Sequence, residues 1–236
     1  MQRLAVVSAV LAIAVLAAPD ARAQLKITEI LYNPAASGDA PWEYVELFNA
    51  SAVDTVSLGG YVLDDDDGNP LTGSNVLAGS VGPRSAVVLF NAQDNTLTAL
   101  RSAWGAAVNF VGVSNWPGLS DSAERIALWD GFISYNARNF ANALADVQYT
   151  SGGVWPLADG VASIHLADVD ADPAAGPNWA LSHLGDSQGA YPSDPAATGG
   201  IVNLGSPGSV VPEPASLALL ALGATTLLLA RRHRAA

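Results

Sequence analysis

Cysteine is absent from all 236 residues of the chain. This absence excludes disulfide cross-links, thiolate zinc or iron–sulfur sites and a cysteine nucleophile. Any catalysis would therefore have to use carboxylates, hydroxyls or the three histidines. Because 50% of the residues are hydrophobic and only 14% are charged, the chain is not of the disordered class, and it is long enough to bury a core.

Basic residues are also scarce between the two ends of the chain. Residues 24–211 contain five basic side chains against 20 acidic ones, which gives this body a net charge of −15. A surface of that sign repels nucleic acid and anionic lipid. We therefore expect no nucleic-acid partner, and we expect solubility or association with cations.

The first 23 residues have the three parts of a secretory signal peptide. Arg3 lies in a short n-region, an apolar stretch follows, and Ala21 and Ala23 are the small residues that signal peptidase accepts. A proline and an aspartate end the apolar run before this site, which disfavours the alternative of a buried N-terminal helix. We predict a signal peptide over residues 1–23 and a mature chain that begins at Gln24.

A second apolar run lies near the other end of the chain. Residues 215–230 carry no charge, and a helix over them would be about 24 Å long, slightly short of a hydrocarbon core of about 30 Å. Arginines that follow the run can reach the membrane interface, and by the positive-inside rule they keep the C-terminus in the cytoplasm. These arginines are Arg231, Arg232 and Arg234. We predict one transmembrane helix over about 215–230.

Pro212, Glu213 and Pro214 stand just before this apolar run. A Pro-Glu-Pro sequence, an apolar span and an Arg-rich end, here within residues 209–236, resemble the PEP-CTERM sorting signal of Gram-negative bacteria. The resemblance implies that exosortase, an integral membrane processing enzyme, removes the tail. The protein would then leave the inner membrane for the cell surface or an extracellular polysaccharide matrix. Hydropathy by itself indicates only a single-pass C-terminal anchor.

The body consists of short apolar segments separated by Asn, Asp, Gly and Pro residues, a pattern that predicts an antiparallel β-sandwich. The predicted strands are 25–33, 43–49, 58–63, 86–90, 125–129 and 164–166. A short surface helix is expected at 97–104, and loops are expected at 137–156 and 182–201. The core candidates are Trp42, Val45, Leu47, Leu58, Val62, Val87, Leu89, Ile126 and Leu128. Alternation along the second strand places Tyr44, Glu46 and Phe48 on one face and Val45 and Leu47 on the other.

Several motifs of the body resemble, in their order, the bacterial form of the lamin-tail domain, an immunoglobulin-like sandwich that also occurs in nuclear lamins. The motifs are ITEILYNP (27–34), WEYVELFNAS (42–51), VSLGGYVLDDDDG (56–68), VGPRSAVVLF (81–90), LSDSAERIALWD (119–130) and LGSPG (204–208). Arg84, Ser85 and Ala123 depart from the glycines that are usual there. The resemblance implies one all-β domain over residues 24–208 without a catalytic motif, because lamin-tail domains are not themselves enzymes.

Motifs of nucleotide-binding proteins and metalloproteases are also absent: the sequence has no P-loop, H-E-x-x-H or G-x-G-x-x-G. One G-x-S-x-G match, at 185–189, lies inside the loop expected at 182–201, where the strand-to-helix turn of a nucleophile elbow is not expected. His165 and His183 lack histidine neighbours at ligand spacing, so each is interpreted as a structural or surface residue; His233 belongs to the tail. Glu29, Glu43 and Glu46 are three carboxylates that might converge. We expect them on exposed strand faces, without a catalytic role.

Two acidic runs are the candidate metal sites. Adjacent carboxylates repel one another unless they are solvated or bind a hard cation such as calcium, which takes six to eight oxygen ligands. Neither run fits the EF-hand pattern, and a solvated acidic turn is the alternative. The candidate ligands are Asp64, Asp65, Asp66 and Asp67 in the first run and Asp168, Asp170 and Asp172 in the second.

The sequence therefore predicts an exported, non-enzymatic β-sandwich module of the cell surface or extracellular matrix. Its expected partners are signal peptidase, exosortase, the inner membrane during processing, and extracellular polysaccharide; no cofactor is expected apart from calcium. The alternatives are a secreted hydrolase, with carboxylates around Glu43, Glu46 and the Asp64 turn, and a calcium-dependent binding protein.

Overall fold

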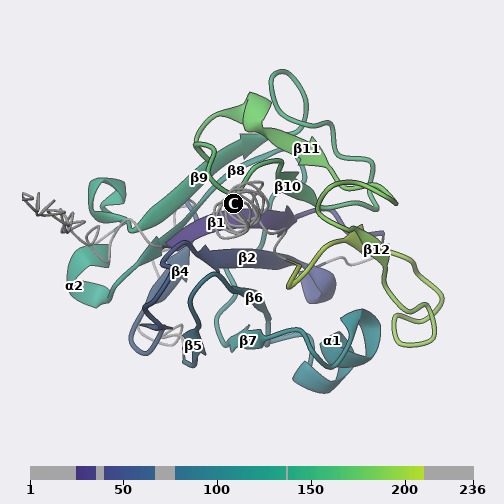
Figure 1. Ribbon diagram of the computed structural model, residues 1–236, viewed down its shortest axis with the longest axis horizontal. Helices are drawn as coiled ribbons and strands as arrows, with labels where there is room; N and C mark the ends of the chain where they lie inside the picture. Colours follow the sequence, from purple (N-terminus) through teal and green to yellow (C-terminus); the bar gives the residue numbers. More distant parts are fainter. Residues whose placement is uncertain (1–24, 36–39, 67–77, 137, 210–236) are drawn as a thin grey trace, which may run out of the picture.

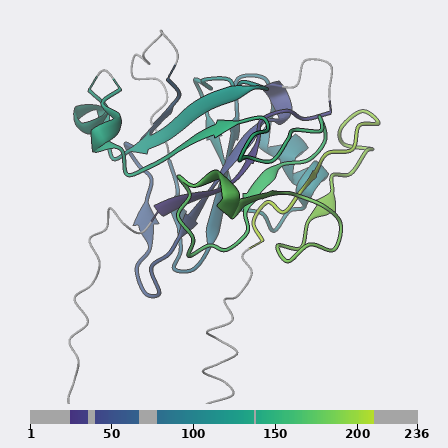
Figure 2. The same cartoon turned by 90° about the horizontal axis from the view of Figure 1, so that it is seen from above.

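The structure, a computed structural model, describes residues 25–35, 40–66, 78–136 and 138–209 (Figure 1). The predicted signal peptide, transmembrane helix and sorting signal lie outside these residues, and so does Asp67. Among the helices of the described ranges, none has the length and apolar character needed to cross a membrane. The first and last described residues lie on the same side of the body in Figure 2.

The larger layer is a six-stranded sheet with the strand order β11, β10, β1, β2, β6, β7. Its strands are β1 (Leu25–Leu31), β2 (Tyr44–Asn49), β6 (Ala86–Asn91), β7 (Phe110–Val113), β10 (Ile164–Leu166) and β11 (Trp179–Leu181). Neighbouring strands run antiparallel except β6 and β7, which run parallel. This one pair departs from the wholly antiparallel prediction because the chain crosses over through helix α1 (Leu97–Trp104) before it returns as β7.

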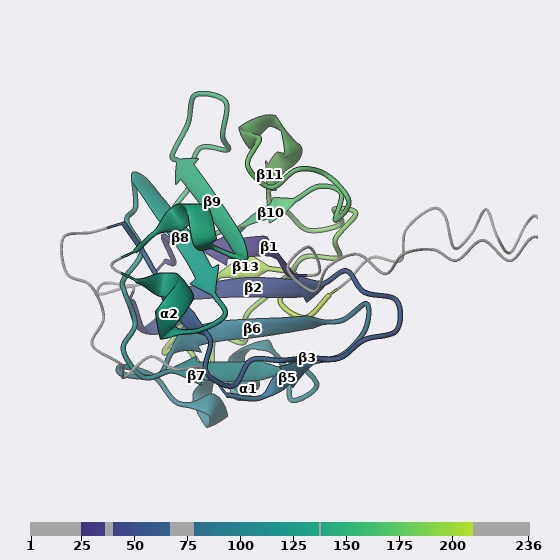
Figure 3. The same cartoon turned by 90° about the vertical axis from the view of Figure 1, so that its left-hand side faces the viewer.

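The second layer is an antiparallel sheet of three strands, β4, β8 and β9. These strands are β4 (Val62–Asp64), β8 (Ala123–Trp129) and β9 (Ala145–Thr150). Strands β8 and β9 cross the strands of the larger sheet steeply in Figure 3. The remaining elements are the pairs β3 (Val56–Ser57) with β5 (Ser80–Val81) and β12 (Tyr191–Pro192) with β13 (Leu204–Gly205), helix α2 (Phe132–Tyr135), and 3-10 turns at Ala40–Trp42, Phe140–Asn142 and Gly176–Asn178.

The main core lies between the two sheets. Val45 and Leu47 belong to it, whereas Tyr44 points to the other face of β2 and packs with Trp104 of α1, so the predicted alternation along β2 is confirmed. Eight of the nine core candidates are fully buried. The exception is Trp42, which is half-buried at the rim of the cluster under α1.

The strand and helix predictions differ from the structure in several segments. Five of the six predicted strands and the helix at 97–104 are confirmed within a few residues. Of the strand predicted at 58–63, only Val62 and Leu63 belong to a strand, β4, because residues 58–61 form a turn closed by the Tyr61 N–H and the Leu58 carbonyl. Strands β7 and β11 are not among the predicted strands.

The loop expected over 137–156 is wrong, because that range contains β9. In β9, Val147 and Tyr149 are buried and Gln148 and Thr150 are exposed. Its polar composition, ADVQYT, hides this two-residue period from a search for apolar runs.

Replacing Leu47 by Ala should lower the free energy of unfolding by about 2 to 5 kcal/mol, because its side chain is fully buried between the sheets. Denaturant unfolding of the mature protein measures this loss. Val53→Ala is the control, since Val53 is 80% exposed and should change the value by less than about 0.5 kcal/mol. Equal effects of the two substitutions would contradict the assigned core.

Candidate functional site

Two glutamates meet at a point where the pairing of β1 with β2 shifts by one residue. Ile27 lies opposite Leu47, but Glu29 lies opposite Glu46, so β1 contains one extra residue. Such a β-bulge reorients the side chains that follow it. Thr28 and Glu29 consequently share the face of the sheet on which Glu46 lies, while Ile27 stays in the main core.

The carboxylate of Glu29 is 1% exposed and accepts four hydrogen bonds. Its Oε1 atom accepts from the hydroxyls of Tyr44, at 2.7 Å, and Ser163, and from the backbone N–H of Ser206 at 2.8 Å. Its Oε2 atom accepts from the Ser206 hydroxyl at 2.9 Å. Four donors on one buried carboxylate replace the water that the charge loses on folding.

Glu46 is 3% exposed and has fewer partners. Its carboxyl accepts from the Thr28 hydroxyl at 2.8 Å and from the backbone N–H of Gly208 at 2.7 Å. Burial, and next the negative charge of Glu29, raise the pKa of Glu46 well above its usual value, while the Gly208 and Thr28 bonds act in the opposite direction. Glu46 therefore takes up a proton at a higher pH than an exposed glutamate does.

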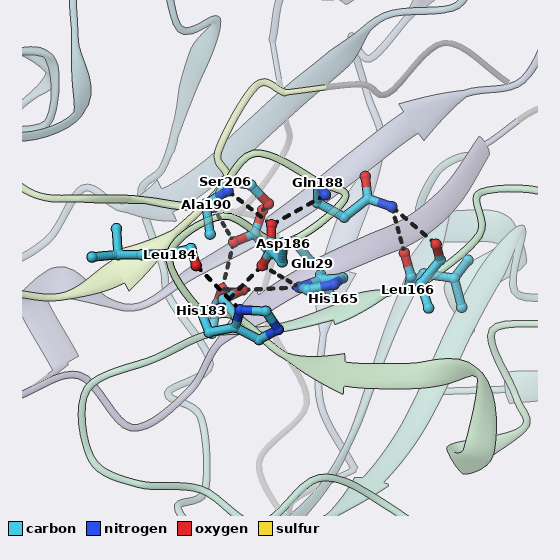
Figure 4. A network of polar contacts seen from close by, with 12 residues as sticks. Glu29, His165, Leu166, His183, Leu184, Asp186, Gln188, Ala190 and Ser206 are labelled. Carbon is cyan, nitrogen blue, oxygen red and sulfur yellow. Dashed lines mark hydrogen bonds and ion pairs between the residues drawn. The ribbon is translucent and has the colours of Figure 1, made fainter.

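A chain of hydrogen bonds leads from Glu29 to a buried histidine on β10, His165. Figure 4 labels the two ends of this chain, Glu29 and His165. The hydroxyls of Ser163 and Ser182 are 2.8 Å apart, and Ser182 Oγ lies 2.9 Å from Nδ1 of His165. Burial lowers the pKa of His165, although the charges of Glu29 and Asp186 act to raise it. Burial outweighs these two charges, so the imidazole is neutral at pH 7.

Asp186 approaches the same imidazole from a loop, with 3.9 Å between its Oδ2 atom and His165 Nδ1. Its carboxylate accepts the backbone N–H groups of His183, Gln188 and Ala190, as Figure 4 shows. Burial acts to raise the pKa of Asp186, but the hydrogen bonds from Ala190 and His183 and the two nearby imidazoles lower it. This carboxylate therefore organises its own loop.

The two glutamates and His165 border a small cavity of about 10 Å³. That volume holds about one water molecule. The site therefore places carboxylates, hydroxyls and an imidazole together without space for a substrate. The other lining residues are Thr28, Phe48, Leu166, Val169, Gln188, Ser206 and Ser209.

Of the three glutamates considered from the sequence, the fold brings only Glu29 and Glu46 together. Glu43 accepts hydrogen bonds from the indole N–H of Trp116, at 2.6 Å, and from the backbone of Leu119, at 3.1 Å. All three are buried, so the expectation of exposed strand faces is wrong, because later segments cover them. Of the histidines, His165 is buried, His183 is exposed, and His233 lies outside the described residues.

The first acidic run is divided between the interior and the surface. Asp64 and Asp65 are 1% and 2% exposed, and both pair with Arg138, at 2.9 and 3.4 Å. Asp64 also accepts a hydrogen bond from the Tyr135 hydroxyl. Asp66 is exposed.

The second acidic run is exposed, and two of its carboxylates accept hydrogen bonds from backbone groups two residues further along the chain. Asp168 and Asp172 accept the backbone N–H groups of Asp170 and Ala174, which are short-range turns of the Asx type. No group of three or more His, Asp or Glu side chains within the described ranges is arranged to hold a metal ion. Calcium binding by either run stays a prediction.

Two family models match the sequence. The Lamin Tail Domain model matches residues 18–150, more than half of the chain. The chain belongs to the lamin tail domain family. The model of the PEP-CTERM protein-sorting motif matches residues 210–234, which confirms that resemblance and implies export and processing at the membrane by exosortase. No curated protein matches this lamin tail domain protein.

The lamin tail match ends at residue 150, yet the six-stranded sheet takes β10 and β11 from the chain beyond it. The groups that reach Glu29, Glu46 and His165 from this later part are Ser163, Ser182, Ser206 and Gly208. The sequence does mark Ser206 and Gly208, because both belong to the closing Gly-Ser-Pro-Gly motif. Single serines at 163 and 182 carry no signal of their own, so sequence reasoning missed them.

Glu124, on β8, forms a second carboxyl pair with Asp66 of the acidic turn. Burial, the hydrogen bond with Asp66 and the charge of Asp65 raise the pKa of Glu124 from 4.5 to about 8. Between pH 4.5 and about 8 the folded protein keeps the proton on Glu124, whereas the unfolded chain has lost it. The free energy of unfolding should therefore fall as the pH rises through this range.

The Glu124→Gln substitution should make the decrease in the free energy of unfolding with rising pH smaller, because the amide side chain does not titrate in this range. Denaturant unfolding of both proteins at several pH values between 4.5 and 8 measures the two slopes. Glu46 contributes a fall of the same sign to both proteins, so their difference isolates Glu124. Identical slopes would show that Glu124 is not the group that titrates.

Proposed function

We propose that this protein is an exported, non-enzymatic β-sandwich module that exosortase sorts to the cell surface or extracellular matrix. The observation that carries the proposal is the order of the two matches, a lamin tail domain followed by a PEP-CTERM motif. Signal peptidase cuts before Gln24, the apolar run at 215–230 holds the protein in the inner membrane, and exosortase then removes this run. The body is left free outside the membrane.

A non-enzymatic role is supported by the small free volume of the buried polar site. A hydrolase needs a carboxylate or imidazole within reach of the bond it cleaves. The carboxylates of Glu29 and Glu46 are occupied by donors of the protein itself, and the cavity beside His165 is about 10 Å³. We therefore assign Glu29, Glu46 and His165 a structural role: their hydrogen bonds hold the fold together.

Extracellular polysaccharide is the proposed ligand class, because a protein released into a matrix meets that polymer first. The acidic runs allow this binding to depend on calcium. The test is a pull-down of the purified mature protein with the organism's own extracellular polymer, with calcium or chelator present. Retention on the polymer supports the proposal, and cleavage of the polymer would favour the hydrolase instead.

Mass spectrometry of the protein from native cells should find an N-terminus at Gln24 and no peptide from Leu217 onward. The reason is that signal peptidase and exosortase each remove one end. An exported protein that still carries residues 231–236 would refute the sorting step while leaving a simple membrane anchor. A strain without exosortase is the control and should retain the tail.

A further inference from the structure

The described part of the chain ends in a tight turn. We call residues 205–208 the tail root. The backbone N–H of Ser209 bonds the carbonyl of Ser206 at 2.8 Å, with Pro207 second and Gly208 third in the turn. Gly208 has φ of 78°, which the third position of a type II turn requires. The turn fixes the backbone up to Ser209, the last residue that the structure describes.

The tail root is held by the two buried glutamates. Glu29 accepts both the backbone N–H and the hydroxyl of Ser206, and Glu46 accepts the N–H of Gly208. A Cβ atom at Gly205 would overlap the Tyr44 hydroxyl and come within 2.8 Å of Glu29 Oε1. The backbone of the tail root therefore lies directly on the Glu29 carboxylate, and we call Glu29 and Glu46 the clamp.

The opposite side of the root is also attached. Leu204 exchanges backbone hydrogen bonds with Val161 and Ser163, at 3.0 and 2.9 Å. The Tyr191 hydroxyl donates to the carbonyl of Pro207 at 3.3 Å. The clamp thus joins β1 and β2 to the last residues that the structure describes.

Little chain separates the clamp from the sorting motif. Pro212 is four residues after Gly208, a distance of at most about 14 Å in extended chain. The predicted membrane span begins seven residues after Gly208, at most about 25 Å away. While the tail is in the membrane, the clamped body is therefore confined close to the membrane surface and to any enzyme that handles the motif.

We propose that the clamp limits the rate at which exosortase removes the tail, an inference that rests on the proposed function. An enzyme must surround the chain on both sides of its recognition motif, and a folded body four residues away competes for that space. Opening of the clamp frees residues 204–209, which lengthens the accessible chain by about 20 Å. Processing then follows local opening of the tail root.

Two variants test this in native cells, where pulse-chase labelling gives the half-time of tail removal. Ser206→Ala removes one donor to Glu29 and should increase opening, seen as roughly tenfold faster amide exchange at Gly205 and Gly208 in the purified protein. Its half-time should be shorter than that of the wild type. Insertion of Gly-Ser-Gly-Ser after Ser209 should also shorten the half-time, with amide exchange at the root unchanged.

Two controls separate clamp effects from general loss of stability. Ser51→Ala removes a buried hydroxyl that bonds within its own turn, and Glu43→Gln alters a buried carboxylate bound to Trp116. Both should leave the half-time at the wild-type value. If Ser206→Ala fails to fold, the insertion variant still decides the question, because it leaves the clamp intact.

If the wild-type, Ser206→Ala and insertion proteins all lose the tail at the same rate, the clamp inference is wrong. The proposed function would still stand. Faster removal in Glu43→Gln as well would also overturn the clamp inference, since stability alone would then set the rate. A wild-type protein that keeps its tail would overturn the proposed function and the clamp inference together.

Discussion

The buried Glu29 and Glu46 pair is the constraint on which much of this structure depends. A carboxylate taken out of water is tolerated only if hydrogen bonds replace its hydration. Six hydrogen bonds reach the pair, from Thr28, Tyr44, Ser163, Ser206 and Gly208. Because these donors come from the first, middle and last parts of the body, the fold is complete only when all of them are in place.

The same requirement explains why the sheet extends past the region that matches the family. Ser163 and Ser206 approach Glu29 from chain segments after residue 150. Ser163 also connects to Ser182 and so to the neutral imidazole of His165, so β10 and β11 pack beside β1 without a positive charge on this buried ring. A domain cut at residue 150 would leave Glu29 without three of its four hydrogen bonds, and such a loss is costly in a protein interior.

A body with a net charge of −15 must place many carboxylates without strong mutual repulsion, and this protein does so in three ways. Asp64 and Asp65 share the guanidinium of Arg138. Asp168, Asp172 and Asp186 accept backbone N–H groups of their own loops. Glu46 and Glu124 have raised pKa values, so each tends to hold a proton beside a neighbouring carboxylate.

The sequence by itself determined the strand-rich architecture, which residues share each face of β2, the helix at 97–104, and the membership of the lamin tail domain family. These features depend on local patterns of period two, on turn residues and on motif order, which are visible without a fold. It missed β9, whose short polar strand has no apolar run, and the parallel pairing of β6 with β7, which a crossover permits.

Only the tertiary structure decided what the charged residues do. A one-residue bulge at Thr28 turns Glu29 toward Glu46. No local pattern in residues 27–31 predicts this bulge. Ser206 reaches Glu29 across 177 positions of the chain, and Arg138 reaches Asp64 across 74. Such contacts depend on how distant segments pack, because a single hydroxyl or guanidinium looks the same in the sequence whether it faces water or a buried carboxylate.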